Sequence, residues 1–182
     1  YAEAYNNLGI SLALGGKIEG AKNAYNKAIE INPRHKDAYF NLANIYSKSG
    51  EISKAIDLYK KAIEIDSENA GAYNNMGILL GKLKRYDEAI AVFRMVIGKN
   101  PDYVEAYNNL GGVLLASGKK NKAIDSYKKA IELDPRCRPA YHNLAVVYFQ
   151  EKNNKLANQY YQKALELGSK NSIISAIPKN SK

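Results

Sequence analysis

The sequence contains little of the chemistry that cross-links or anchors a chain. Its 182 residues include no tryptophan and a single cysteine, Cys137. One cysteine excludes a disulfide within the chain, and this cysteine usage favours a reducing, cytoplasmic location. No apolar run approaches the roughly 20 residues that a helix needs to cross a bilayer, so we expect no transmembrane segment.

Catalytic and metal-ligating residues are also scarce. The chain has two histidines, His35 and His142, and neither stands at a metal-ligand spacing from Cys137. The arginines on either side of Cys137 could lower the pKa of its thiol, but we favour an ordinary turn cysteine as the interpretation. Gly111 and Gly112 lie inside a helical pattern and form no phosphate loop. We therefore predict no catalytic residue, no metal, no cofactor and no enzymatic activity.

A 34-residue repeat, in contrast, occurs five times. A short phrase recurs in each unit: AYNNLG at 4–9, AYFNLA at 38–43, AYNNMG at 72–77, AYNNLG at 106–111 and AYHNLA at 140–145. The units run over residues 2–35, 36–69, 70–103, 104–137 and 138–171. Because repeats of this kind pack only on their neighbours, we expect a stack of units without a central core.

Each unit is predicted to fold as two antiparallel helices, with positions counted from its first residue. Apolar or small residues recur at positions 4, 7, 8 and 11 and again at 20, 24, 27 and 28, which is helical spacing. Glycine is placed to end the first helix of three units in a left-handed conformation, at Gly16, Gly50 and Gly118. Small residues at positions 8 and 20 permit close approach of the helices, and aromatic residues at 4 and 24 fill the remaining space.

This pattern resembles the tetratricopeptide repeat (TPR) family over residues 2–171. The family's aromatic residues at 4 and 24, Leu-Gly at 7–8, alanine at 20 and 27 and proline at 32 recur here. The resemblance implies an all-α, right-handed superhelical solenoid of antiparallel helix pairs, whose first helices line a concave groove. The departures are local, since Lys84 and Lys152 replace a turn glycine and Val96 replaces an alanine. The AYNNLG phrases are most similar to the TPR arms of O-linked N-acetylglucosamine transferases and related scaffold proteins.

Residues 172–182 follow the last unit. The segment 172–177 is apolar at helical spacing and stops at Pro178. We expect a short capping helix there, followed by a disordered tail, with a frayed end as the alternative.

The net charge of +9 suits nucleic acid, but the placement of the residues argues against it. Five tyrosines at position 4 and four at position 24 account for nine of the 15 tyrosines, and core tyrosines cannot stack on bases. The densest lysines fall on second helices and turns: Lys54, Lys60, Lys61, Lys119, Lys120, Lys122, Lys128 and Lys129. We predict a solvated outer face and no nucleic-acid partner, with a basic stripe for an acidic partner or membrane as the alternative.

Asparagine supplies the candidate binding residues, because it occupies position 6 of every unit and position 5 of three. A primary amide offers the donor and the acceptor that a peptide backbone needs. The predicted peptide-binding residues are Asn7, Asn41, Asn75, Asn109, Asn143, Asn6, Asn74, Asn108, Asn44 and Phe149, of which Phe149 is the apolar anchor. Further apolar groove positions are Ile10, Ile78, Leu115 and Val146. The alternative is that the amides bond locally between helices.

These observations predict a non-catalytic protein–protein interaction scaffold that holds an extended segment of a partner protein in its groove. One alternative is a substrate-recruiting arm of a larger enzyme such as a glycosyltransferase. It follows from the chain's start at Tyr1 rather than Met, which suggests a fragment or processed piece. The other alternative is a structural scaffold that self-associates through its open ends.

Overall fold

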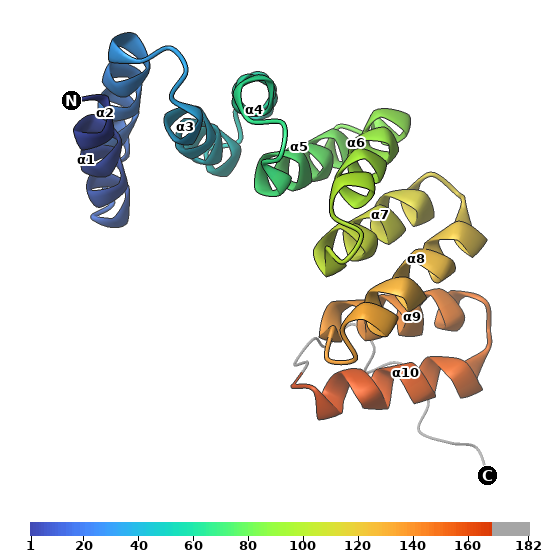
Figure 1. Cartoon of the computed structure of the whole chain (residues 1–182). Coiled ribbons are helices and arrows are strands. Elements are labelled where there is room, and N and C mark those ends of the chain that lie inside the picture. The colour runs from blue at the N-terminus through green and yellow to red at the C-terminus, as the bar shows by residue number, and fades with distance from the viewer. Residues whose placement is uncertain (169–182) are drawn as a thin grey trace. The chain divides into compact units, whose positions relative to one another are not determined.

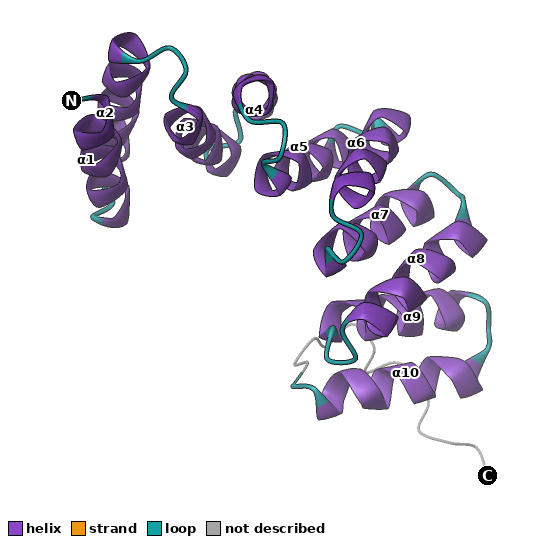
Figure 2. Cartoon of the chain, viewed as in Figure 1, coloured by secondary structure: helices purple, strands orange, loops and turns teal. Residues whose placement is uncertain are grey.

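The computed structural model describes residues 1–168, which form ten α-helices and no strand (Figure 2). The first five helices are α1 (Ala2–Leu14), α2 (Ile18–Ile31), α3 (Lys36–Lys48), α4 (Ile52–Ile65) and α5 (Ala70–Lys82). The others are α6 (Tyr86–Lys99), α7 (Val104–Ala116), α8 (Lys120–Leu133), α9 (Arg138–Gln150) and α10 (Asn154–Glu166). The predicted all-α class is confirmed. The predicted capping helix at 172–177 lies outside the described residues.

The helices belong to two compact units, Tyr1–Val92 and the residues from Phe93 onward, and the division falls within α6. In the first unit, α1 packs on α2 and α3 packs on α4 (Figure 1). The second helix of each pair also contacts the following first helix, so that α2 meets α3 and α4 meets α5. In the second unit α7 pairs with α8, α8 meets α9, and α9 pairs with α10.

Left-handed residues end the first helices, as the glycine pattern predicts. Gly16, Gly50 and Gly118 have φ of 73°, 82° and 78°. Lys84 and Lys152, which replace glycine at this turn, adopt the same region at φ 59° and 57°. The tight turn is therefore kept even where a Cβ makes the left-handed conformation costly.

Close helix contact around small residues forms the core. The alanines at position 20 have no exposed surface: Ala21, Ala55, Ala89, Ala123 and Ala157. At position 8, a Cβ on Gly9 would lie 2.5 Å from the ring of Tyr25, and a Cβ on Gly111 equally close to Tyr127. Tyr25, Tyr59 and Tyr127 are at most 3% exposed, which confirms their prediction as core aromatics.

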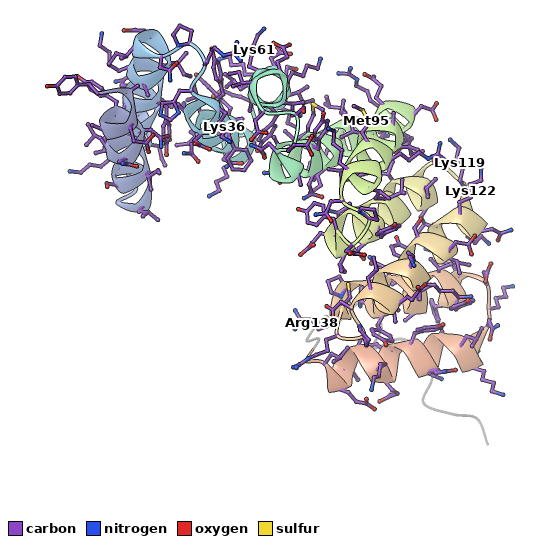
Figure 3. All side chains as sticks on the ribbon, in the orientation of Figure 1. Lys36, Lys61, Met95, Lys119, Lys122 and Arg138 are labelled. Carbon is purple, nitrogen blue, oxygen red and sulfur yellow. The ribbon has the colours of Figure 1, made fainter. Side chains whose placement is uncertain are left out.

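The lysines of the second helices lie on the surface. Lys61 extends from α4 and Lys122 from α8 (Figure 3). Several pair with carboxylates: Lys54 with Glu51 at 2.6 Å, Lys61 with Glu64 at 2.8 Å, Lys129 with Glu132 at 2.6 Å and Lys120 with Glu151 at 3.2 Å. Exposed ion pairs of this kind contribute about 0–1 kcal/mol each to stability. The lysines therefore form a solvated face.

Candidate functional site

A pocket of about 380 Å³ lies between α1 and α3 in the first unit. We call it the α1–α3 pocket. Its lining residues are Ile10, Ala13, Leu14, Ile18, Tyr25, Asn41, Asn44, Ile45, Lys48 and Ser49. Its volume falls in the range of about 300–1,000 Å³ that is typical of ligand pockets. Two predicted binding residues, Asn41 and Asn44, meet here, together with the predicted apolar position Ile10.

Apolar side chains at this pocket remain open to solvent. Leu14 is 85% exposed, Ile18 41% and Ile10 38%. Leu14 stands at position 13, where the other repeats carry lysine, alanine or glutamine. A leucine exposed to this degree contributes little to folding, so its surface is available for a ligand.

The asparagines form hydrogen bonds across the seams between repeats. The Nδ2 of Asn41 donates to the Oδ1 of Asn6 at 3.0 Å, and the Nδ2 of Asn143 donates to the Oδ1 of Asn108 at 3.0 Å. Each bond joins position 6 of one repeat to position 5 of the preceding repeat. Asn6 is only 3% exposed, so this predicted peptide contact serves the seam.

The third repeat uses a different arrangement. The Nδ2 of Asn75 donates to the Oδ1 of Asn44 at 3.1 Å and to the hydroxyl of Tyr59 at 3.3 Å. The Tyr59 hydroxyl in turn donates to the same Asn44 oxygen at 2.5 Å. This triad ties α5 to α3 and α4. It also occupies the Asn44 oxygen twice, which leaves the Asn44 Nδ2 as a donor for the pocket that Asn44 lines.

The local-bonding alternative therefore describes many of these amides. Of the other predicted residues, Asn7 is exposed, Asn74 is half-buried, and Asn109 is half-buried and accepts a bond from Asn108 at 3.5 Å. Peptide binding by the asparagines stays a prediction. It now applies to the amide atoms that are not engaged in hydrogen bonds between repeats.

The second unit presents Phe149, the predicted anchor, with 40% of its surface exposed on α9. His142 directly precedes Asn143 on the same helix and is half-buried. Its Nδ1 is buried and has no hydrogen-bond partner within residues 1–168. Burial lowers the pKa of His142, so the imidazole is neutral at pH 7.

Sequence reasoning missed Leu14, Ile18 and Tyr25 at this site. The signal for Leu14 was present, since it is apolar at a groove position that is otherwise mostly polar. Tyr25 was assigned to the core, which is correct, but it also lines the pocket. That dual placement depends on the neighbouring side chains and has no signature in the repeat.

The structure favours the ordinary turn cysteine at Cys137 over the alternative of a lowered thiol pKa. Cys137 is 8% exposed at the N-cap of α9. Burial, the largest influence, raises the pKa of its thiol, so it is an ordinary turn cysteine. His35 is 7% exposed and its Nε2 lies 3.3 Å from the Oε2 of Glu3.

Two further features are absent from residues 1–168. No cluster of three or more histidine, cysteine, aspartate or glutamate side chains suited to a metal ion occurs among these residues. None of the helices described there has the length and apolar character needed to span a membrane.

Comparison with protein families accounts for most of the chain. A model described as tetratricopeptide repeat matches residues 2–35, 70–103 and 104–137. The chain belongs to the tetratricopeptide repeat family. Further models of that description match residues 24–57 and 139–171, and one described as TPR repeat matches 43–84.

Solved structures similar to this TPR chain include MamA, which is 29% identical with a TM-score of 0.80, over 88% of this chain and 94% of MamA. Pseudomonas aeruginosa PilF is 31% identical with a TM-score of 0.81, over 93% of this chain and 78% of PilF. YrrB, described as a TPR protein with an unusual peptide-binding site, is 26% identical with a TM-score of 0.74, over 92% of this chain and 87% of YrrB. A search of curated proteins found no match.

Proposed function

We propose that this TPR chain is a non-catalytic scaffold that binds an extended segment of a partner protein along its first helices. The observation that carries this proposal is the α1–α3 pocket, where exposed Leu14 and Ile10 stand beside the amides of Asn41 and Asn44. A mainly apolar wall with a few directed polar groups is the usual composition of a ligand site. The peptide-binding site described for YrrB supports the same use of the fold.

The seam bonds limit what the asparagines contribute to affinity. A net hydrogen bond is worth about 0.5–1.5 kcal/mol, and the amides of Asn41 and Asn44 have already used part of their capacity. Burying one large apolar side chain adds about 1.5–3 kcal/mol. The pocket therefore supplies most of the affinity, and we expect dissociation constants from about millimolar to micromolar.

The test is a nuclear magnetic resonance titration of the ¹⁵N-labelled chain with capped peptides that differ in one central residue, Phe, Leu or Ser. We expect the Phe and Leu peptides to shift amide resonances of α1 and α3, and the Ser peptide to have little effect. Leu14→Asp should weaken binding about tenfold, since the lost contact is worth roughly 1.4 kcal/mol. Its melting temperature should stay unchanged, because Leu14 is 85% exposed.

Met95→Asp is the matched control, because Met95 is 51% exposed on α6 and lies outside the pocket (Figure 3). It should bind as the native chain does. Native affinity in Leu14→Asp, or shifts that avoid α1 and α3, would count against the proposal.

A second candidate function, self-association, is supported by the outer face of α1. Ala4 is exposed, whereas alanines at the same position elsewhere have no exposed surface: Ala38, Ala72, Ala106 and Ala140. Leu8 is 47% exposed, whereas its counterparts are at most 7% exposed: Leu42, Met76, Leu110 and Leu144. This face carries the same residue types that are buried between repeats elsewhere, so its apolar surface suits contact with a second copy of the chain.

Sedimentation of the native chain over a range of concentrations tests that candidate. We expect its mass to rise with concentration and to fall to that of the monomer in Leu8→Asp, since a charge on this face opposes its burial. Leu14→Asp serves as the control and should associate as the native chain does. A mass independent of concentration would exclude this use of the α1 face. The similarity to glycosyltransferase arms stays a prediction.

A further inference from the structure

The tyrosine at position 24 is hydrogen-bonded in one repeat and left unbonded in another. In the second repeat, the Tyr59 hydroxyl donates to Asn44 and accepts from Asn75. Tyr25 holds the same position in the first repeat and is 3% exposed, yet its hydroxyl makes no hydrogen bond within residues 1–168. The difference arises at position 9, where Ile10 replaces the asparagine that accepts from Tyr59.

The Tyr25 hydroxyl is not fully buried, since within residues 1–168 the Nδ1 of His142 is the buried side-chain atom that lacks a partner. Tyr25 lines the α1–α3 pocket, so a bound ligand can supply the missing acceptor. Burial raises the pKa of Tyr25, which keeps its hydroxyl protonated at neutral pH. It is therefore available as a donor.

The pocket's other unused polar groups are mostly donors as well. The Asn44 oxygen is occupied by Tyr59 and Asn75, so its Nδ2 remains. Lys48 is exposed and has no ion-pair partner in the part of the chain that the structure describes. Asn41 keeps its oxygen, which can accept from a backbone N–H. The lining residues include no carboxylate. The pocket thus combines three donors, one of them cationic, with an apolar wall.

We propose that the α1–α3 pocket selects a segment in which a large apolar side chain stands directly beside an aspartate or glutamate. The apolar side chain packs against Ile10, Leu14 and Ile18, and the carboxylate accepts from Tyr25 and Asn44 beside the charge of Lys48. Hydrogen bonds to a carboxylate are about twice as strong as those between neutral groups. This inference rests on the proposed function and adds the class of ligand.

The experiment compares three peptides with capped ends, each with a single Phe in a Ser-Gly context. The residues on both sides of the Phe are aspartate, asparagine or lysine, and binding is followed by chemical shifts in the ¹⁵N-labelled chain. We expect the aspartate peptide to bind about tenfold more tightly than the asparagine peptide, and the lysine peptide to bind most weakly. In Lys48→Gln the advantage of aspartate over asparagine should shrink several-fold.

Two tyrosine variants separate recognition from folding. Tyr25→Phe should weaken binding of the aspartate peptide about tenfold without lowering the melting temperature, since its hydroxyl has no partner to lose. Tyr127→Phe is the matched control, because Tyr127 holds the same repeat position outside the pocket, and it should leave the affinity for the aspartate peptide unchanged.

The outcomes distinguish this inference from the function on which it rests. If none of the three peptides shifts α1 and α3, groove binding itself fails and the inference fails with it. If all three bind equally and Tyr25→Phe binds as the native chain does, peptide binding stands and carboxylate selection is overturned. A matching peptide that ends in a free Phe carboxylate and binds more tightly would overturn the side-chain source of the carboxylate.

Discussion

Gly111 and Gly112 differ in the space available for an added Cβ. At Gly111 an added methyl group would lie 2.5 Å from the ring of Tyr127, whereas at Gly112 it would meet only the Tyr127 hydroxyl at 3.9 Å. Both residues lie in α7 and both cost helix propensity, about 1 kcal/mol relative to alanine. Their difference therefore isolates the close approach of α7 and α8.

We predict that Gly112→Ala raises the free energy of unfolding by about 1 kcal/mol. Gly111→Ala should lie about 1–3 kcal/mol below that variant, because the Tyr127 ring must shift to admit the methyl group. Urea unfolding followed by circular dichroism measures both. An equal rise in the free energy of unfolding in both variants would contradict this, because it would show that the Tyr127 ring shifts at no energetic cost.

At the scale of elements, the asparagine row joins helices that are distant in sequence. Asn75 reaches from α5 to Asn44 on α3 and Tyr59 on α4. The sequence-based expectation treated Asn75 only as a peptide-binding residue. The triad changes that expectation, because its loss removes bonds between repeats.

We predict that Asn75→Ala lowers the free energy of unfolding by about 1–2 kcal/mol relative to Asn7→Ala, since two half-buried hydrogen bonds are lost. Asn7 is the matched control: it holds the same repeat position, is exposed, and makes no seam bond in the described part of the chain. The gain in helix propensity is common to both variants. Equal stabilities on thermal unfolding would mean that the triad contributes nothing net.

For the molecule as a whole, the repeated core tyrosine sets its response to alkali. Burial raises the pKa of Tyr127 to about 12, and also raises the pKa of Tyr25 and Tyr59 from the ordinary value of 10.0. The folded state then holds these protons more tightly than the unfolded state. The stability they contribute is complete below pH 10 and is lost as the pH rises toward 12.

We therefore predict that the chain loses helix between about pH 10 and 12, with Tyr127 alone accounting for about 2–3 kcal/mol. Tyrosinate absorbance and circular dichroism, recorded together, should show exposed tyrosines ionising first and buried ones ionising as helix is lost. Tyr127→Phe should move the unfolding to higher pH. Ionisation of all tyrosines in one step with the helices intact would contradict this.

Many residues of the site could be predicted from the sequence, but their hydrogen bonds could not. The repeat register placed Asn41, Asn44 and Ile10 on the groove side, and the structure brings them to one pocket. Asn6 was placed beside them, but it is buried in a seam. The register gives the direction of a side chain from its own helix, whereas the partner of an amide depends on the neighbouring repeat.

The sequence by itself determined the helix pairs, the turns and the aromatic core, because helical periodicity and glycine placement act within a single repeat. The turns at Lys84 and Lys152 depart from that glycine pattern, and the structure shows that they keep the left-handed conformation. Only the tertiary structure decided which asparagines bond to each other, why Tyr25 has an unused hydroxyl, and that Cys137 is buried. These properties arise between repeats, where one changed neighbour, such as Ile10 in place of asparagine, alters the contacts without altering the pattern.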